Sequence, residues 1–171
     1  MSRWLTDQFL WLGRERSRAF REWSLLQRLT DLGLPSPRAV ACRVVRHGMI
    51  YSADLITERI PDVVPLSTRL VDQGLDPAGW RSVGEMVARF HRHNVFHADL
   101  TAHNIQIDNS GRLFLLDFDR GKIMAGPGAW TRRNLARLQR SLNKISRENA
   151  TGFNAGAWQQ LLEGYRSGIP V

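Results

Sequence analysis

Apolar residues at close to helical spacing predict two amphipathic helices in the first half of the chain. Over residues 14 to 32 the apolar positions are Phe20, Trp23, Leu26 and Leu29. Gly33 is a suitable C-terminal cap for this helix, and Pro35 and Pro37 prevent its continuation. Residues 77 to 94 carry a second apolar face, made by Trp80, Val83, Val87 and Phe90.

Four shorter segments predict two pairs of strands. Residues 39 to 46 and 49 to 57 are rich in apolar and β-branched residues and are separated by a His-Gly turn. Ile105 to Asp108 and Leu113 to Leu116 predict a second pair, because Asn109-Ser110-Gly111 between them is typical of a tight turn.

The remaining segments predict a linker and three further helices. Glu58 to Pro65 contains two prolines and is typical of a hinge. Residues 66 to 72 predict a short helix. Residues 131 to 147 and 156 to 166 predict longer helices, each with leucines on one face.

The order of these elements predicts an α+β fold in two parts. Residues 1–64 form a small, sheet-containing N-terminal lobe that ends in a hinge near 58–64, and residues 65–171 form a mostly helical C-terminal lobe. The 171 residues are enough for a hydrophobic core, and an apolar content of 43% is ordinary for a soluble protein. Because the sequence has no signal-peptide pattern and a single cysteine, Cys42, we predict a cytoplasmic protein.

The charge of the chain indicates an anionic partner. Lys and Arg total 24 against 16 Asp and Glu, which gives a net charge of +8. Lys122 and Lys144 are the two lysines, so 22 of the 24 cations are arginines, the better bidentate partners for phosphate and carboxylate. Nucleic acid, phosphorylated lipid, an anionic sugar and a nucleotide all fit this charge.

The most informative motif is Asp99-x4-Asn104, followed by Asp117-Phe118-Asp119. The spacing, with a predicted hairpin between the two halves, resembles the catalytic centre of protein-kinase-like phosphotransferases. In that pattern the first aspartate accepts the proton of the attacking hydroxyl, while the asparagine and the second aspartate hold magnesium, a cation that prefers oxygen ligands. The competing interpretation is that these are turn and strand-end residues without a catalytic role.

Two positions depart from the protein-kinase pattern. Ala98 stands where protein kinases usually have arginine, which favours a small-molecule or sugar kinase. Asp119 replaces the usual glycine, and it is either a further metal or acceptor contact or a tolerated variant.

A carboxylate on the first predicted helix fits the same pattern. Glu22 shares a helical face with leucines, where a charge needs a cationic partner. In the kinase fold this helix carries a glutamate that pairs with a strand lysine, and Glu22 fits that role. The competing interpretation is a surface acid paired with Arg18 or Arg21.

The lysine partner and a Gly-x-Gly-x-x-Gly loop are not in the sequence, since Lys122 and Lys144 both follow Asp117. We therefore expect an N-terminally truncated kinase that begins near its first helix. A start codon assigned too far downstream, a fragment and a degenerate, catalytically impaired remnant all explain this pattern, and the first is our expectation.

The chain resembles the bacterial 3-deoxy-D-manno-octulosonic acid (Kdo) kinases of the lipopolysaccharide kinase group. The resemblance lies in Arg18 to Trp23, Leu32 to Pro37, Asp54 to Ile60 and His97 to Asn104. It implies a protein-kinase-like fold with ATP and Mg2+ as cofactors. It also implies phosphorylation of the 4-hydroxyl of Kdo on a Kdo-lipid A precursor, in lipopolysaccharide core biosynthesis at the cytoplasmic face of the bacterial inner membrane.

The resemblance also implies roles for individual residues. It assigns the general base to Asp99 and the magnesium ligands to Asn104 and Asp117. The further nucleotide-binding positions that it implies, with adenine bound by the backbone of the hinge, are Glu22, Glu58, Arg59 and Ile60.

A basic helix fits a lipid acceptor. Residues 128 to 147 contain no acid, and their cations are Arg132, Arg133, Arg137, Arg140, Lys144 and Arg147. Such a face suits lipid phosphates or an anionic membrane surface, with Trp130 and Trp158 at the interface. The competing interpretation is a solvated basic face, with both tryptophans in the core.

Two other function classes compete with a kinase. Histidines 91, 93, 97 and 103 around Asp99 suggest a metal-dependent hydrolase, but that reading gives the hairpin and the second acid no role. The net charge suggests nucleic-acid binding, but we find no helix-turn-helix, zinc-finger or RNP pattern and expect no nucleic-acid partner.

Overall fold

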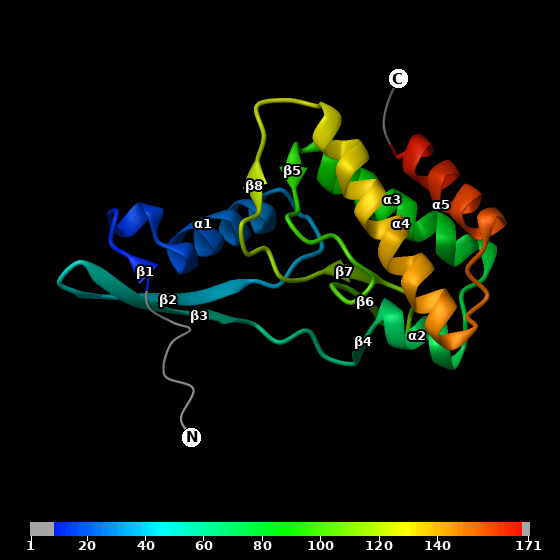
Figure 1. The fold of residues 1–171 in the computed structure, drawn as a ribbon, viewed down its shortest axis with the longest axis horizontal. Coiled ribbons are helices and arrows are strands. Elements are labelled where there is room, and N and C mark those ends of the chain that lie inside the picture. Colours follow the sequence, from blue (N-terminus) through cyan, green and yellow to red (C-terminus); the bar gives the residue numbers. More distant parts are fainter. Residues whose placement is uncertain (1–8, 169–171) are drawn as a thin grey trace.

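The computed structural model describes residues 9–168, which form a sheet-rich end (residues 9–57) and a helix-rich end (residues 63–168). Figure 1 shows the first helix lying along a long strand pair at one end and several helices packed together at the other. Helices and small antiparallel sheets confirm the predicted α+β class. Residues 1–8 and 169–171 of the two predicted parts lie outside the described residues.

The sheet-rich end is a three-stranded antiparallel sheet with one helix. Its strand order is β1-β3-β2, with β1 (Phe9–Leu10), β2 (Ala39–His47) and β3 (Ile50–Thr57). The sequence predicted β2 and β3 and missed the two-residue β1. Helix α1 (Arg18–Asp31) packs against β2 and β3. Its buried side chains are Ala19, Leu25, Leu26 and Leu29.

Helix α1 begins four residues later than predicted. A 3₁₀ turn, η1 (Arg14–Arg16), comes first, and extended backbone at Ser17 separates it from the helix. The Ser17 hydroxyl donates to the Arg14 carbonyl at 2.7 Å, which stabilises this break. At the other end Gly33 has a φ of 62°, which confirms the predicted glycine cap.

The predicted linker ends in a strand. β4 (Val63–Pro65) pairs with β6 (Ile105–Asp108), which pairs with β7 (Leu113–Leu115), giving a second antiparallel sheet of order β4-β6-β7. Pro65 is tolerated because β4 is an edge strand. The last residues of the predicted linker therefore belong to the helix-rich end, and the division into lobes at 58–64 stays a prediction.

The turn between β6 and β7 is the predicted tight turn. Asp108 Oδ1 accepts from the backbone N–H groups of Ser110 and Arg112, each at 2.9 Å. The Ser110 hydroxyl and the Arg112 guanidinium also donate to this carboxylate, and these bonds hold the pKa of Asp108 down to about 2. The hairpin that carries Asp117 at its end is fixed by its own turn.

Four helices build the rest of the helix-rich end: α2 (Leu66–Asp72), α3 (Pro77–Arg92), α4 (Ala129–Asn149) and α5 (Ala155–Ser167). The four apolar residues predicted to form one face of α3 are all buried. α3 ends two residues early, because Asn94 takes a left-handed conformation with a φ of 56°. α3 and α5 approach closely, since a Cβ on Gly84 would overlap the Leu161 carbonyl oxygen.

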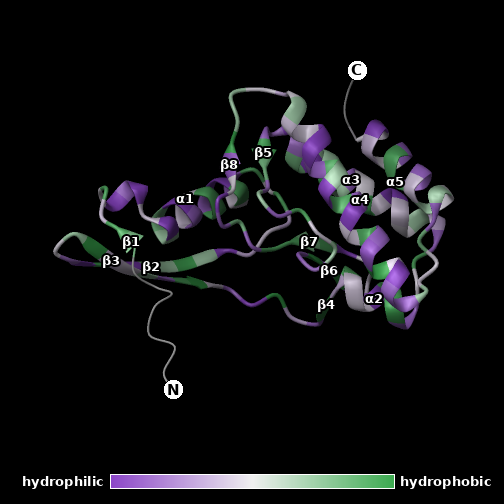
Figure 2. Cartoon of the chain, viewed as in Figure 1, coloured by the Kyte–Doolittle hydropathy of each residue, from purple (hydrophilic) through white to green (hydrophobic). Residues whose placement is uncertain are grey.

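A short pair, β5 (Val95–Phe96) and β8 (Lys122–Ile123), joins the residues just before the Asp99 loop to those that follow Asp119 and lead to α4. Trp130 at the start of α4 is 4% exposed and donates its Nε1–H to the Gly126 carbonyl at 2.9 Å. For Trp130 the core interpretation is therefore right, and a place at a membrane interface is wrong. Trp158 is partly buried and packs against the core. Figure 2 shows hydrophilic and hydrophobic residues alternating along α4. Within residues 9–168, no helix is long and apolar enough to cross a membrane.

Candidate active site

Asp99 and Asn104 lie on one irregular loop between β5 and β6. The Asn104 amide donates to the Asp99 carbonyl at 2.8 Å, and the Asn104 backbone N–H donates to the Thr101 carbonyl at 3.2 Å. The loop is thus closed by its own hydrogen bonds. The Asp99 carboxylate is about half exposed, and its Oδ1 accepts from Arg137 Nη1 of α4 at 2.7 Å.

His97 joins this loop to the strand that precedes Asp117. Its Nε2–H donates to the Leu116 carbonyl at 2.9 Å, and its Nδ1 accepts from the Asp99 N–H at 3.2 Å. Its ring also packs edge-on against Phe118, with ring centroids 4.9 Å apart. Burial lowers the pKa of His97, which keeps the ring neutral and suits these one-donor, one-acceptor bonds. One buried side chain therefore sets the distance between the two halves of the motif.

Asn134 of α4 anchors the same loop to the helices. Its amide donates to the His97 carbonyl at 2.8 Å, and its Oδ1 accepts from the His97 N–H and from His91 Nε2, both at 3.3 Å. The Tyr165 hydroxyl of α5 donates to His91 Nδ1 at 2.9 Å. Burial lowers the pKa of His91 to about 4. The ring nitrogens of His91 and His97 are thus engaged with protein partners.

Asp117 follows β7 in a left-handed conformation, with a φ of 61°. The Leu116 N–H donates to the Asn104 carbonyl at 2.8 Å, which places Asn104 beside the residue that precedes Asp117. The structure therefore brings together the three residues predicted for the base and the metal. Asp119 forms a two-point ion pair with Arg18 of α1, and its N–H donates to Asp117 Oδ1 at 3.3 Å.

Glu22 of α1 faces this acidic end. Burial raises the pKa of Glu22, the carboxylates of Asp117 and Asp119 raise it further, and the nearby Arg18 opposes them. Glu22 and Asp117 line one pocket of about 390 Å³ together with Leu26, Pro37, Leu55, Thr57 and Leu116. Among residues 9–168, no cation lies within 4.0 Å of the Glu22 carboxylate, so the interpretation of Glu22 as a surface acid paired with Arg18 or Arg21 is wrong.

The predicted adenine hinge, Glu58 to Ile60, follows β3 directly. The Glu58 N–H donates to the Arg38 carbonyl at 2.8 Å, and the two side chains form an exposed ion pair at 3.6 Å. The Glu58 N–H is therefore occupied. A backbone donor for adenine has to come from Arg59 or Ile60, whose binding role stays a prediction.

The donor set at Asn104 and Asp117 suits magnesium. The Asn104 amide nitrogen is held by the Asp99 carbonyl, which leaves the Asn104 oxygen as its acceptor end. Mg2+ is usually held by one or two carboxylates, with water and substrate phosphates completing its shell. In the part of the chain that the structure describes, no group of three His, Cys, Asp or Glu side chains could hold a metal alone. Oxygens of a bound nucleotide would therefore complete the site.

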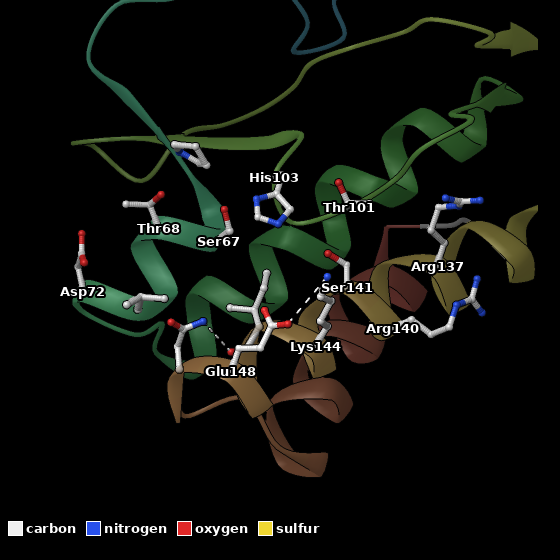
Figure 3. A pocket seen from close by; sticks show the side chains of 14 residues that line it. Ser67, Thr68, Asp72, Thr101, His103, Arg137, Arg140, Ser141, Lys144 and Glu148 are labelled. Carbon is white, nitrogen blue, oxygen red and sulfur yellow. Dashed lines mark hydrogen bonds and ion pairs between the residues drawn. The ribbon is translucent and has the colours of Figure 1, made fainter.

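A larger pocket of about 830 Å³ lies between α2 and α4, next to the Asp99 loop. Figure 3 shows His103 at its centre, with Ser67 and Thr68 of α2 on one side and Arg137, Arg140 and Lys144 of α4 on the other. We did not predict this pocket from the sequence. It was not foreseeable, because its walls come from segments far apart in the chain.

The supporting roles of His97, Asn134 and Arg137 were also missed. His97 is part of the motif, but the sequence gives no sign that its ring bridges to Leu116. Of these three residues, Asn134 is the one whose role the sequence could have indicated. It is an uncharged polar residue among the apolar positions of a basic helix. Its contacts join α4 to the catalytic loop across 37 residues of sequence.

Comparison with known proteins agrees with this geometry. The family model described as "Lipopolysaccharide kinase (Kdo/WaaP) family" matches residues 1–165. A protein of Stenotrophomonas maltophilia (strain K279a) named 3-deoxy-D-manno-octulosonic acid kinase is 44% identical over 144 residues, covering 84% of this chain and 57% of the relative. One with the same name from Xylella fastidiosa (strain M23) is 38% identical over 159 residues, covering 93% and 64%. The chain thus spans about three fifths of the length of these relatives.

Proposed function

Because the chain belongs to the lipopolysaccharide kinase (Kdo/WaaP) family, we propose that it transfers phosphate from ATP to the 4-hydroxyl of Kdo on a Kdo-lipid A precursor. This reaction is a step of lipopolysaccharide core biosynthesis. The observation that carries the proposal is the junction of the two motif halves, in which His97 bonds both to Asp99 and to Leu116. That junction supports the proposal, because it holds Asp99, the proposed general base, close to Asn104 and Asp117, the proposed magnesium ligands.

The proposed chemistry assigns one role to each group. The acceptor oxygen bonds to the γ-phosphorus while the bond from that phosphorus to the β–γ bridging oxygen breaks, and ADP leaves. The hydroxyl proton passes to the Asp99 carboxylate. Asn104 and Asp117 hold Mg2+, which supplies neutralisation of the phosphate charge when bound. Glu22 and the hinge from Glu58 to Ile60 border the nucleotide.

We further propose that the protein works at the cytoplasmic face of the inner membrane, bound to its anionic surface. The support is a stripe of exposed cations on α4, spaced alternately by four and three residues so that they share one helical face. The stripe consists of Arg133, Arg137, Arg140, Lys144 and Arg147. Each cation close to an anionic leaflet contributes about 1 kcal/mol to binding.

The test of the function is a transfer assay with [γ-32P]ATP, Mg2+ and Kdo-lipid A precursor. Asp99→Ala is expected to lower the rate by about 10²- to 10⁴-fold, the usual contribution of a general base. Asp31→Ala is the matched control, since Asp31 is an exposed acid at the end of α1 and should leave the rate unchanged. Equal rates for wild type and Asp99→Ala would overturn the assignment of the base.

The same assay separates the alternatives to this function. A remnant without activity would give no transfer with any acceptor. Another sugar kinase would label a different sugar and leave Kdo-lipid A unlabelled. The absence of label on Kdo-lipid A would therefore refute the proposed substrate, and label on free sugars would name the replacement.

A further inference from the structure

The 830 Å³ pocket between α2 and α4 lies directly beside the proposed base. Arg137 lines the pocket and at the same time donates to the Asp99 carboxylate at 2.7 Å. Thr101 and His103, from the catalytic loop itself, form another part of the wall. A molecule bound there would lie next to the ion pair between Arg137 and Asp99.

Cations dominate one wall of this pocket. Arg137, Arg140 and Lys144 of α4 lie on this wall, and the acids Glu148 of α4 and Asp72 of α2 also line the pocket. Arg137 is engaged by Asp99, and Lys144 approaches Glu148 only at 3.9 Å. Among residues 9–168, no carboxylate lies within 4.0 Å of the Arg140 guanidinium. Arg140 is thus a cation without an acidic partner, at the edge of a cavity.

Hydroxyl groups line the opposite wall and the floor. Ser67 and Thr68 come from α2, and Ser141 comes from α4. The Ser141 hydroxyl already accepts from the Ala102 N–H at 3.2 Å, which fixes the floor to the catalytic loop. A pocket with cations on one side and hydroxyl groups on the other suits a polyhydroxylated acid.

We infer that this pocket binds the sugar acid that accepts the phosphate, with Arg140 and Lys144 binding its carboxylate. The inference rests on the proposed function for the identity of the acceptor. That acid is 3-deoxy-D-manno-octulosonic acid, which the names of the relatives contain. A guanidinium and an ammonium together offer several charge-assisted hydrogen bonds to one carboxylate. Serine and threonine hydroxyls bind the sugar hydroxyls, and the acceptor hydroxyl points toward Asp99.

The nucleotide is assigned to the other pocket. The cavity of about 390 Å³ contains Glu22 and Asp117 and is lined mainly by apolar groups, whereas the larger one contains neither residue. The two pockets share no lining residue. Donor and acceptor are thus assigned to separate cavities.

The test is an equilibrium titration of the full chain, followed by 1H–15N NMR, without ATP. The probes are the methyl ketoside of Kdo, the same ketoside with its carboxyl reduced to an alcohol, and inorganic phosphate. The acid ketoside should shift resonances of α2, the catalytic loop and α4. The reduced ketoside should bind about tenfold more weakly, because it cannot accept charge-assisted bonds from Arg140 and Lys144.

Variants locate the carboxylate. Arg140→Gln should weaken binding of the acid ketoside about tenfold and leave the reduced ketoside unchanged, and Lys144→Gln should act in the same direction. Arg132→Gln is the matched control, because Arg132 is an exposed cation of α4 that does not line the pocket. It should change neither affinity, and preserved spectral dispersion shows that each variant is folded.

Three outcomes would overturn the inference. These are equal affinities for the two ketosides, equal effects of Arg140→Gln and Arg132→Gln, and inorganic phosphate that binds at the same residues as tightly as the acid. The last result would assign the pocket to phosphate. Because no phosphate is transferred in this titration, its failure leaves the proposed kinase reaction standing, and a negative transfer assay leaves the binding result standing.

Discussion

The two ends of the molecule differ in how firmly they hold their residues. In β2 and β3 of the sheet-rich end, Tyr51 is the one fully buried residue, and Val40 and Ile56 are largely exposed. In β6 of the helix-rich end, all four residues are buried. The sheet-rich end therefore depends on hydrogen bonds and on the apolar face of α1, whereas the helix-rich end is a packed core.

The residues of the candidate site come from both ends of the molecule. Asp99 and Asn104 stand on a loop fixed by His97 and Asn134, both buried and fully engaged in hydrogen bonds. Glu22 is partly buried on α1 of the sheet-rich end, and Glu58, directly after that end, forms an exposed ion pair with Arg38. The proposed base and the proposed magnesium ligands thus have a rigid frame, while the proposed nucleotide side has a softer one.

The largest expected loss of stability comes from a substitution that disrupts packing in the helix-rich end. Gly84→Ala places a Cβ against the Leu161 carbonyl oxygen and 2.6 Å from the Tyr165 nitrogen, so α3 and α5 must separate. We expect a loss of unfolding free energy of about 3 kcal/mol or more, measured by urea unfolding. Gly152→Ala is the control, because nothing lies within 4 Å of a Cβ there. Equal stability of the two variants would mean that α3 and α5 do not pack this closely.

The second effect is a loss of stability on acidification, which originates in the packed end. The folded protein keeps His91 neutral down to a pKa of about 4, whereas the unfolded chain protonates it near 6.5. The unfolded state therefore binds more protons between these values, and stability falls as pH falls from 6.5 to 4. The loss attributable to His91 is at most about 3 kcal/mol, since one pKa unit corresponds to about 1.4 kcal/mol.

The measurement is urea unfolding at several pH values between 4 and 7. His91→Gln should give a shallower slope than wild type over this range, although its absolute stability is lower. His47→Gln is the control, because His47 is exposed on β2 and should keep the wild-type slope. A wild-type curve that is flat over this range would contradict the neutral, buried His91.

The sequence predicted the local features of the structure and did not predict the contacts between distant segments. Periodicity located α1, α3 and both hairpins, because a local pattern of apolar residues is enough to define an element. The motif at Asp99, Asn104 and Asp117 was visible because each residue lies at a fixed distance from a turn. The His97 bridge and the pocket under Arg140 were not predictable, since they depend on segments that meet only in the folded chain.

Equivalent changes at the two tyrosines compare the two ends directly. Tyr165→Phe leaves Nδ1 of the buried His91 without its donor, and we expect a loss of about 1–3 kcal/mol. Tyr51→Phe removes the acceptor of the Arg18 N–H at the start of α1, where Arg18 itself is exposed, and we expect a loss of about 1 kcal/mol or less. Thermal unfolding of both variants measures the difference. A larger loss at Tyr51 would contradict the view that the sheet-rich end is the softer frame.

The smallest expected effect concerns the charge of Glu22 in the sheet-rich end, because the surroundings of this carboxylate disfavour its ionised form. Burial and the carboxylates of Asp117 and Asp119 raise the pKa of Glu22, so the folded protein favours its protonated form. The unfolded chain ionises Glu22 near 4.5, and the stability from this group is lost as pH rises from there through the higher folded pKa. At neutral pH, Glu22→Gln should therefore be slightly more stable than wild type.

The gain should be less than about 1 kcal/mol, since Glu22 is partly exposed and water screens the repulsion. Urea unfolding at pH 7 and at pH 4 measures it, and the gain should disappear at the lower pH. Glu15→Gln, an exposed acid in η1, is the control and should show no gain. A loss of stability in Glu22→Gln would mean that a cation pairs with Glu22 in the folded chain. A gain would mean that the carboxylate is kept for a ligand, at a small cost to the sheet-rich end.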